Sequence, residues 1–408
     1  MIETLSQALH ASFGPDAPRR VGVAVSGGGD SMALLLAVLE AGFTPEAVTV
    51  NHGLRPEATA EAAFVARFCA ERGIAHTTLH WEGAQAEGNL MDAARRARLR
   101  LIGAWARERG IDQVALGHTA DDQAETFLMR LAREAGTEGL AGMRPAFEAE
   151  GVRWLRPFLR TGRDDLRGYL TQQGIGWVDD PTNLDDRYDR VKARKALAAL
   201  RPLGISVEKL TAVVANIAMT EGAVGLGLQR LAAAHVQVIS GDVVIAAEGF
   251  SQAFGPEMQR RMVNAALAWV SGADYPPRAT KVNDFLCSWR ERRDRTLHGC
   301  RITTTESEIR ITREAKAVAG LRVPVGRVWD RWRLDGPAAA GLEIAALGAE
   351  GLKQVKDWRA CGLPRPSLLA SPAIWQGTRL VAAPLSGLEN GWKAQIAGPS
   401  FTSALIRR

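Results

Sequence analysis

Four short runs of aliphatic and β-branched residues alternate with helix-forming stretches along the first third of the chain. The runs cover residues 21–25, 47–52, 76–81 and 113–118, and stretches with helical spacing follow at 32–42, 57–72, 90–109 and 121–134. An alternation of strand and helix with a repeat of about 30 residues predicts a parallel sheet with helices on both faces. We therefore predict an α/β fold for this part of the chain.

Polar residues follow three of the predicted strands, at the point where each strand ends. These segments are Ser26–Ser31, Asn51–Arg55 and Gly117–Asp122. In an open parallel sheet, ligands bind outside the carboxyl ends of the strands. We expect the three segments to lie at one edge of the sheet and to form a binding site.

The first of these segments reads Ser-Gly-Gly-Gly-Asp-Ser and leads from a strand into a helix. Its glycines permit a tight turn and close approach of the backbone to an anion, and the helix start offers unpaired N–H groups. A Walker-type loop is excluded, because no lysine precedes Lys192. Asp30 would repel a bare phosphate, so its presence predicts a metal ion between them. The alternative is a plain turn capped by Asp30 or Ser31.

The segment 117–126 places Asp122 and Glu125 three residues apart on a predicted helix, so both carboxylates can face one ligand. Two carboxylates beside a phosphate site predict a cation, either Mg²⁺ or an ammonium group. A simpler explanation for Asp121 and Asp122 is that acidic residues favour a helix N-terminus. His118 is expected to reach the cleft, and a purely structural histidine is its alternative.

The rest of the chain divides at its proline and glycine residues. We predict three domains, at residues 1–203, 204–322 and 323–408, of which the second is mainly helical and the third is small and α+β. Further helices are predicted at 163–173, 207–234, 257–271 and 281–295, with a strand at 154–159 and a hairpin at 301–312.

The charge and the cysteine pattern indicate the surroundings of the protein. The net charge of +6 fits an ordinary solvated surface or a polyanionic partner such as nucleic acid. No unbroken apolar run approaches the ~20 residues of a membrane span, and the N-terminal residues lack the regions of a signal peptide. The four cysteines form no C-x-x-C pair. We therefore expect a cytoplasmic protein without membrane association.

Several motifs resemble those of one enzyme family. Residues 26–31 resemble the S-G-G-x-D-S loop of the N-type ATP pyrophosphatases, the PP-loop superfamily. The other matching segments resemble, in order, those of the tRNA(Ile)-lysidine synthetases: N-H-G-L-R at 51–55, G-H-T-A-D-D-Q-A-E-T at 117–126, R-P-F-L at 156–159, W-V-D-D-P-T-N at 177–183 and D-R-Y-D-R at 186–190. The resemblance covers about residues 20–200 and is weak beyond them.

This resemblance implies a reaction and a set of ligands. The expected reaction joins L-lysine to C2 of the wobble cytidine, position 34, of tRNA(Ile) with a CAU anticodon. It proceeds through an adenylated cytidine and releases AMP and pyrophosphate. The resemblance thus implies ATP with Mg²⁺, L-lysine and this tRNA as ligands, with both later domains binding the tRNA, and leaves the oligomeric state open.

The resemblance also assigns residues to these ligands. The expected ATP site is Ser26, Gly27, Gly28, Gly29, Asp30 and Ser31, with Asp30 at the metal. The expected catalytic residues are Asp30, His118, Asp122 and Arg194, and the expected lysine site is Asp122 with Glu125. The expected tRNA contacts are Arg133, Arg190, Lys192 and Arg194.

Two departures and two alternatives accompany this interpretation. The family usually has R-G-S-G where Glu134 stands in R-E-A-G, and R-N-x-x-R where Val191 stands in R-V-K-A-R. One alternative is a PP-loop tRNA thiolase, which needs a reactive cysteine, although Cys69 is expected to be buried. The other is an inactive nucleotide- and RNA-binding protein.

Two residue sets in the C-terminal half have competing interpretations. Tryptophans near positions 289, 329 and 332 fit core packing better than base stacking. The arginines at 290, 292, 293 and 295 fit tRNA phosphates or a salt-bridged helix face equally well.

Overall fold

The computed structural model describes residues 2–15, 18–53, 57–81, 90–179, 187–273, 277–337 and 340–406. Leu54 and Arg55 of the second motif and residues 180–183 and 186 of the last two motifs lie outside the described residues. The chain forms two compact units, Met1–Glu221 and Gly222–Arg408.

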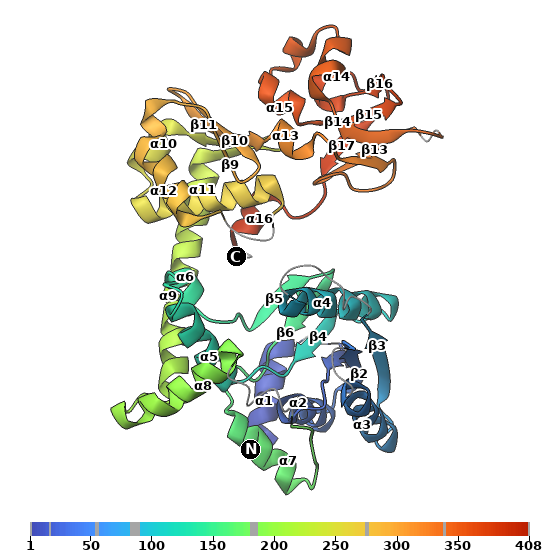
Figure 1. The fold of residues 1–408 in the computed structure, drawn as a ribbon, viewed down its shortest axis with the longest axis vertical. Helices are drawn as coiled ribbons and strands as arrows, with labels where there is room; N and C mark the ends of the chain where they lie inside the picture. The colour runs from blue at the N-terminus through green and yellow to red at the C-terminus, as the bar shows by residue number, and fades with distance from the viewer. Residues whose placement is uncertain are drawn as a thin grey trace. The chain divides into compact units, whose positions relative to one another are not determined.

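A six-stranded sheet forms the centre of the first unit (Figure 1). Its strands are β1 (Arg20–Ala24), β2 (Thr44–Asn51), β3 (Ala75–His80), β4 (Gln113–Leu116), β5 (Ala146–Ala149) and β6 (Val152–Leu155). The order is β3-β2-β1-β4-β6-β5, and every neighbouring pair is parallel except the β5–β6 hairpin. The strand order reverses between β1 and β4, which is where open α/β sheets bind ligands.

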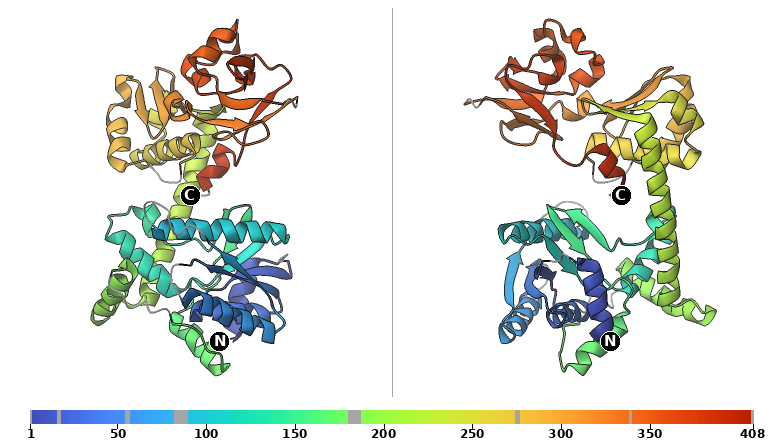
Figure 2. Two further views of the ribbon diagram at one scale, coloured as in Figure 1. Left: turned by 45° about the vertical axis from the view of Figure 1, so that its right-hand side comes forward. Right: turned by 180° about the vertical axis from the view of Figure 1, so that it is seen from behind.

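Helices cover both faces of this sheet, as predicted (Figures 1 and 2). One face carries α1 (Ile2–Phe13), α2 (Gly29–Glu40), α3 (Glu57–Glu71) and α7 (Arg163–Gln172), and the other carries α4 (Leu90–Glu108). Side chains alternate along a strand, so Val21 and Val23 of β1 pack in the first core and Ala24 packs in the second. The structure confirms the predicted α/β class.

A smaller helical cluster completes the first unit. It consists of α5 (Ala120–Leu131), α6 (Thr137–Leu140), α8 (Asp189–Leu200) and the start of α9 (Val207–His235). Phe127, Leu197, Leu210 and Val214 form its core. The predicted boundary at residue 203 precedes α9, whereas the division between the two units lies within this helix.

Helix α9 has a second notable property. By length and composition, it is the one helix in the described part of the chain that could cross a membrane. The longest unbroken apolar run did not predict it, because polar residues interrupt its apolar stretches. One such helix is weak evidence for a span. Leu210 and Val214 of α9 pack in the first unit, and Leu228 packs in the core of the second.

An antiparallel sheet with the order β7-β8-β11-β10-β9 begins the second unit. Its strands are β7 (Val236–Ile239), β8 (Asp242–Ala246), β9 (Arg295–Leu297), β10 (Cys300–Thr304) and β11 (Glu308–Arg313), and its helices are α10 (Ala247–Gln252), α11 (Pro256–Ser271), α12 (Ala279–Ser288) and α16 (Phe401–Ile406). The predicted hairpin at 301–312 is confirmed as β10 and β11. The helix predicted at 281–295 ends at Ser288 because a 3₁₀ turn and a left-handed Arg292, with φ +54°, follow it.

The remaining residues form two further sheets, with the orders β12-β14-β15-β16 and β13-β17. The elements are α13 (Ala315–Val318), β12 (Arg322–Pro324), β13 (Trp332–Asp335), β14 (Glu343–Ala346), α14 (Gly348–Gln354), α15 (Arg365–Leu369), β15 (Pro372–Gln376), β16 (Arg379–Ala382) and β17 (Lys393–Ile396). Trp289, Trp329 and Trp332 are all buried. Core packing is thus confirmed over base stacking for these tryptophans.

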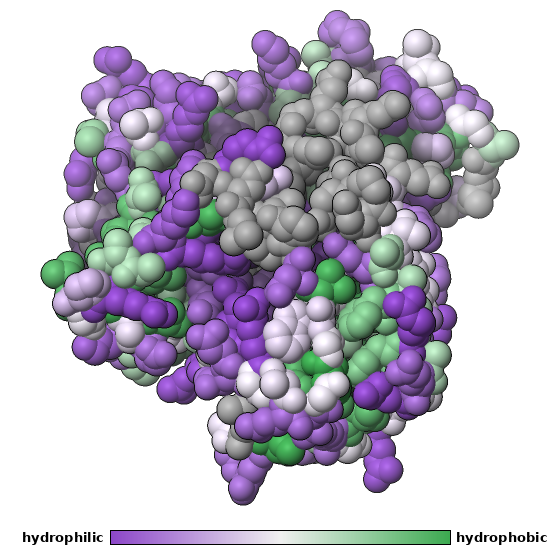
Figure 3. Space-filling model, turned by 60° about the horizontal axis from the view of Figure 1, so that its bottom comes forward, coloured by the Kyte–Doolittle hydropathy of each residue, from purple (hydrophilic) through white to green (hydrophobic). Residues whose placement is uncertain are grey.

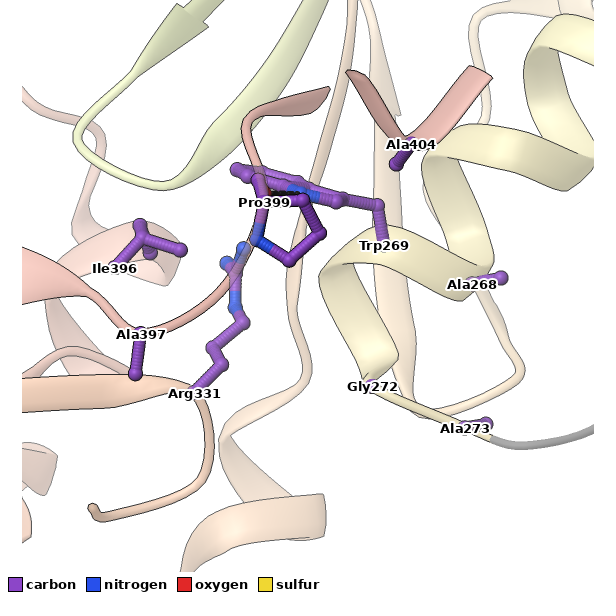
Figure 4. Close-up of a pocket in the computed structure, with 9 residues that line it drawn as sticks. All are labelled: Ala268, Trp269, Gly272, Ala273, Arg331, Ile396, Ala397, Pro399 and Ala404. Atoms are coloured by element: carbon purple, nitrogen blue, oxygen red, sulfur yellow. Dashed lines mark hydrogen bonds between the residues drawn. The ribbon is translucent and has the colours of Figure 1, made fainter. Parts of the chain in front are cut away.

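The second unit contains a hollow of about 280 Å³ (Figure 4). It is lined by Trp269, Arg331, Pro399 and several small residues, and the Arg331 guanidinium stacks on Trp269 at 4.9 Å. Arg331 Nη2 also donates to the Gly241 carbonyl at 2.6 Å. None of the predicted site residues lines this hollow.

Candidate active site

The segment Ser26–Ser31 forms a tight turn between β1 and α2. Gly27 has φ +91°, a left-handed conformation that favours glycine. Ser31 Oγ accepts the Ser26 N–H at 3.1 Å and donates to the Gly28 carbonyl at 2.9 Å. Gly28 is the N-cap of α2, and no side chain caps this helix. The Ser31 hydroxyl thus stabilises the turn, as the simpler alternative requires, while the first N–H groups of α2 can still bind an anion.

The segment after β4 lies directly against this loop. A Cβ atom on Gly117 would lie 2.9 Å from the Asp30 carbonyl oxygen, so this position requires glycine. Helix α5 begins two residues later, with Thr119 as its N-cap. The close approach brings Asp122 and Glu125 to the same end of the sheet as Asp30, as the sequence predicts.

Arg163, the first residue of α7, lies among these three carboxylates. Each of its nitrogens donates to a different one: Nε to Asp30 Oδ2 at 3.1 Å, Nη1 to Glu125 Oε1 at 3.1 Å and Nη2 to Asp122 Oδ1 at 3.3 Å. The side chains of Arg163, Asp30, Asp122 and Glu125 are 16%, 22%, 7% and 1% exposed. The site is therefore a largely buried cluster of one guanidinium and three carboxylates.

The three carboxylates differ in how fully their oxygens are used. Asp122 Oδ2 accepts from the Thr119 N–H and hydroxyl. The Asp122 N–H donates in turn to Thr119 Oγ1, which completes a capping box on α5. By contrast, Asp30 Oδ1 and Glu125 Oε2 are buried without a partner. A buried carboxylate oxygen without a partner is costly, so a cation bound at either oxygen would remove that cost. Asp122 thus fills the helix-start role that the sequence offered as its simpler explanation, and it also faces the cluster.

Burial and charge act in opposite directions on these groups. Burial raises the pKa of Asp30, and Arg163 offsets only part of this effect. Burial also acts on Asp122, but Arg163, Arg190 and the hydrogen bond from Thr119 hold its pKa below the ordinary value. Arg163 is held in its charged form by its three partners, which raise its pKa despite burial. Asp122 and Arg163 are thus both favoured in their charged forms.

His118 stands at the end of β4 beside Arg156. Arg156 Nε donates to His118 Nδ1 at 3.2 Å, so the proton of the neutral ring lies on Nε2. Burial, with a smaller contribution from the neighbouring Arg156, lowers the pKa of His118 to about 3. The ring is therefore uncharged at neutral pH, and it acts as a hydrogen-bond donor through Nε2 rather than as a positive charge.

The four residues predicted to contact tRNA lie on α5 and α8 or directly after them, and they form two sets. Arg190 and Arg194 turn toward the acidic cluster, with Arg190 Nη1 3.6 Å from Asp122 Oδ1 and Arg194 Nε donating to Glu125 Oε1 at 2.7 Å. Arg133 and Lys192 are exposed and share the exposed Asp189. Of these four residues, Arg133 and Lys192 are the two whose side chains are exposed enough to contact a large ligand at the surface.

Two basic residues at this site were not predicted to act in it. Arg163 donates to all three carboxylates of the acidic cluster, and Arg156 fixes the tautomer of His118. Arg156 also stacks on Phe147 at 4.4 Å and donates to the Arg144 carbonyl. Sequence offered only weak signals: Arg163 begins a predicted helix after Gly162, and Arg156 opens the R-P-F-L segment.

The residues present accommodate Mg²⁺ only in a shared site. Asp30 Oδ1 is a buried oxygen without a partner and is of the ligand type that Mg²⁺ prefers. No group of three His, Cys, Asp or Glu side chains among the described residues could hold a metal. A bound Mg²⁺ would therefore take one oxygen from Asp30 and the rest from phosphates and water.

The structure clarifies both departures and the thiolase alternative. Glu134 adopts φ +55°, a conformation that suits the glycine usual in the family, and Val191 is buried in α8. Cys69 is buried, and burial raises the pKa of its thiol to about 11. Since Cys69 is the only cysteine before residue 222, the first unit has no reactive thiol to serve a thiolase.

The arginine group at 290–295 pairs with neighbouring acids. Arg292 contacts Glu306 at 2.6 Å and Arg293 contacts Glu291 at 3.6 Å, and both arginine side chains are more than half exposed. Exposed pairs of this kind contribute little free energy, so the side chains can also bind phosphates. The face in Figure 3 is largely hydrophilic, with apolar side chains in separate patches.

The fold and the loop define a PP-loop protein, and a family model described as a PP-loop domain matches residues 1–200. A tRNA(Ile)-lysidine synthase from Ruegeria pomeroyi is 47% identical over 399 residues, which cover 97% of this chain and 95% of that protein. One from Hyphomonas neptunium is 37% identical and covers 71% of this chain and 80% of its own length. The chain belongs to the tRNA(Ile)-lysidine synthase family and is an enzyme, a ligase.

Among solved structures, the U34-tRNA thiolase NcsA from Methanococcus maripaludis is 18% identical, with a TM-score of 0.45, and the match covers 53% of this chain and 77% of that one. A likeness this distant carries no argument about function.

Proposed function

We propose that this enzyme joins L-lysine to C2 of the wobble cytidine, position 34, of tRNA(Ile) with a CAU anticodon. The C2 carbonyl oxygen attacks the α-phosphorus of ATP and expels pyrophosphate, which gives an adenylated cytidine. The ε-amine of lysine then attacks C2 and loses a proton, and AMP leaves with the former carbonyl oxygen. The observation that supports this proposal most is a phosphate loop beside buried carboxylates with two free oxygens.

The roles of the residues follow from their contacts. The loop Ser26–Ser31 and the start of α2 would hold the ATP phosphates. Asp30 would supply one ligand to Mg²⁺, whose charge offsets that of the phosphates. Glu125, oriented together with Asp122, would bind an ammonium group of lysine. His118 Nε2 and Arg194 would donate to oxygens that gain negative charge during the reaction.

The tRNA would extend beyond the catalytic domain, because a tRNA is much larger than one α/β domain. Exposed Arg133 and Lys192 would contact its phosphates near the reacting base. The predicted domains 204–322 and 323–408 would bind other parts of it, through side chains such as Arg292 and Arg293. This substrate is found in the cytoplasm, so we place the enzyme there.

The reaction is tested by incubating the enzyme with radiolabelled lysine, ATP and unmodified tRNA(Ile) bearing the CAU anticodon. Label should enter this tRNA only when ATP is present, and AMP and pyrophosphate should form in equal amounts. A methionine tRNA with the same anticodon is the matched control and should stay unlabelled. Absence of label in tRNA(Ile) with a folded enzyme would overturn the proposed reaction.

The tRNA contacts of the second unit are tested with the double variant Arg292→Gln, Arg293→Gln. The salt dependence of tRNA affinity should become shallower by about one charge for each lost phosphate contact. The variant Arg260→Gln, Arg261→Gln is the matched control, since these two side chains also pair with a glutamate but are only 30% and 10% exposed. Equal salt slopes in all three proteins would remove Arg292 and Arg293 from the interface.

A further inference from the structure

We propose that Arg163 is a positioning residue, and that its guanidinium sets which carboxylate oxygens of the site remain open to ligand cations. It holds one oxygen of Glu125 and one of Asp30, and in each carboxylate the other oxygen is buried without a partner. The free oxygen of Glu125 would then receive the ammonium group of the amine substrate. This inference rests on the proposed function, which names that amine.

Main-chain contacts fix the position of Arg163 relative to α5. Its own N–H donates to Asp121 Oδ2 at 2.7 Å, and the Ala120 N–H donates to the Thr161 carbonyl at 2.9 Å. The first N–H groups of a helix need such acceptors, so Asp121 anchors the start of α7 to the start of α5. These contacts therefore fix the position of the Arg163 guanidinium relative to Asp122 and Glu125 on α5.

The acids and arginines of the cluster balance in number, so the unpartnered oxygens, and not a net negative charge, indicate where a cation can bind. Asp30, Asp122 and Glu125 are faced by Arg163 from α7 and by Arg190 and Arg194 from α8. His118 and Arg167 also lie close, on β4's following loop and on α7. The side chains of Arg190 and Arg194 are 42% and 30% exposed, against 16% for Arg163. Arg163 is thus the most buried of the three arginines that balance the acids.

The shape of the guanidinium matters as much as its charge. Three nitrogens in one plane reach three carboxylates on two helices, α2 and α5. A lysine ammonium is a single point on a flexible stem and cannot span the same acceptors. Loss of the fork would leave Glu125 Oε1 to Arg194 Nε, at 2.7 Å, and the Arg194 side chain is 30% exposed. The oxygen that meets the substrate amine would therefore be held less firmly.

A double-mutant cycle on lysine use tests this role. Arg163→Gln and Arg163→Lys should each raise the KM for L-lysine by about tenfold or more, by loss of one charge-assisted contact. In a Glu125→Gln background, the same changes at Arg163 should add little to KM, because the residue acts through Glu125. Arg153→Gln is the matched control, since Arg153 is exposed on β6 and is not among the residues that face the cluster, and its KM should stay unchanged.

Two outcomes overturn the proposal. One is that a change at Arg163 raises the KM for L-lysine equally in the wild type and in the Glu125→Gln background. Arg163 would then act independently of Glu125. The other is full rescue by Arg163→Lys, which would mean that charge alone is required. If Arg163→Gln fails to fold, the double-mutant cycle is measured with Arg163→Lys instead.

A ligand-free measurement separates this proposal from the proposed function. Urea unfolding of the wild type, Arg163→Gln, Glu125→Gln and the double variant reports the contact without any substrate. The two single losses should exceed in sum the loss in the double variant, and additive losses would refute the contact. A wild type that shows this coupling but incorporates no lysine would overturn the proposed function instead.

Discussion

Both units bury carboxylates against arginines, but they use the carboxylate oxygens differently. In the second unit, Asp242 Oδ2 accepts from Arg310 Nη1 at 3.1 Å and from Ser367 Oγ at 2.6 Å. Asp330 is held by Arg313 through three contacts of 3.0–3.3 Å. Neither aspartate has a buried oxygen without a partner in the described part of the chain.

The cluster in the first unit leaves acceptors open. Asp30 and Glu125 each keep one buried oxygen without a partner beside the phosphate loop. An ion pair that only joins elements of the fold satisfies its own acceptors, since an unmet buried group costs about 1–3 kcal/mol or more. A site that binds a cation keeps acceptors free until the ligand arrives. The unpartnered carboxylate oxygens of Asp30 and Glu125 therefore distinguish this cluster from the ion pairs of Asp242 and Asp330.

The strongest test of this comparison removes a carboxylate with a free oxygen. Asp30→Ala should lower AMP formation by about 10²–10³-fold or more, because one preorganised charge beside the phosphates is lost. Thermal unfolding should show that the fold persists. Near-normal turnover of a folded variant would remove Asp30 from the chemistry.

The same change in a satisfied carboxylate should instead cost stability. Asp242→Asn should destabilise the second unit by about 1–3 kcal/mol, since the buried Arg310 loses one of its two acidic partners and keeps Glu308. Lysine incorporation per folded molecule should stay at the wild-type level. Urea unfolding and an activity assay on the same sample check both parts, and a loss of activity without a loss of stability would break the comparison.

Within the first cluster, Glu125 and Asp122 should differ. Glu125→Gln should raise the KM for lysine by about 10–100-fold, the size of one hydrogen bond to a charged group. Asp122→Asn should also impair lysine use but additionally destabilise the protein, because Asp122 forms the capping box of α5. Steady-state kinetics with lysine varied at saturating ATP distinguish the two, and an unchanged KM in both variants would refute the lysine site.

The neutral state of His118 gives the first unit a pH dependence. Its pKa falls from 6.5 unfolded to about 3 folded, so its contribution to stability is complete above pH 6.5 and is lost as pH falls toward 3. Between pH 6.5 and 5 the wild type should lose on the order of 1–2 kcal/mol. His118→Gln should show a shallower slope in urea unfolding across this range, and an equal slope would contradict the assignment.

The smallest expected effect concerns Glu134, whose backbone is left-handed at φ +55°. Glu134→Gly should relieve a left-handed conformation and raise stability by about 0.5–1 kcal/mol. The Tm should rise by a few degrees at most. An alanine substitution keeps the strain and is the matched control, so an equal rise in both variants would exclude backbone relief as the cause.

Sequence by itself determined the architecture of the catalytic domain and the place of its site. The alternation of strands and helices predicted the parallel sheet, and the polar segments after the strands predicted the edge at which Asp30, Asp122 and Glu125 meet. These features are local: a period of 2 or 3.6 residues, or a glycine at a turn, acts over a few residues. Spacing along one helix likewise placed Asp122 and Glu125 on one face.

Only the tertiary structure decided how these residues are connected. Arg163 is 133 residues from Asp30 and 38 from Glu125 in sequence, and no local pattern links them. Arg156 is 38 residues from the histidine whose tautomer it fixes. The pKa values and the unmet oxygens of the site depend on such distant partners and on burial, which exist only once the chain is packed. Periodicity is a property of neighbours in sequence, whereas charge balance is a property of neighbours in space.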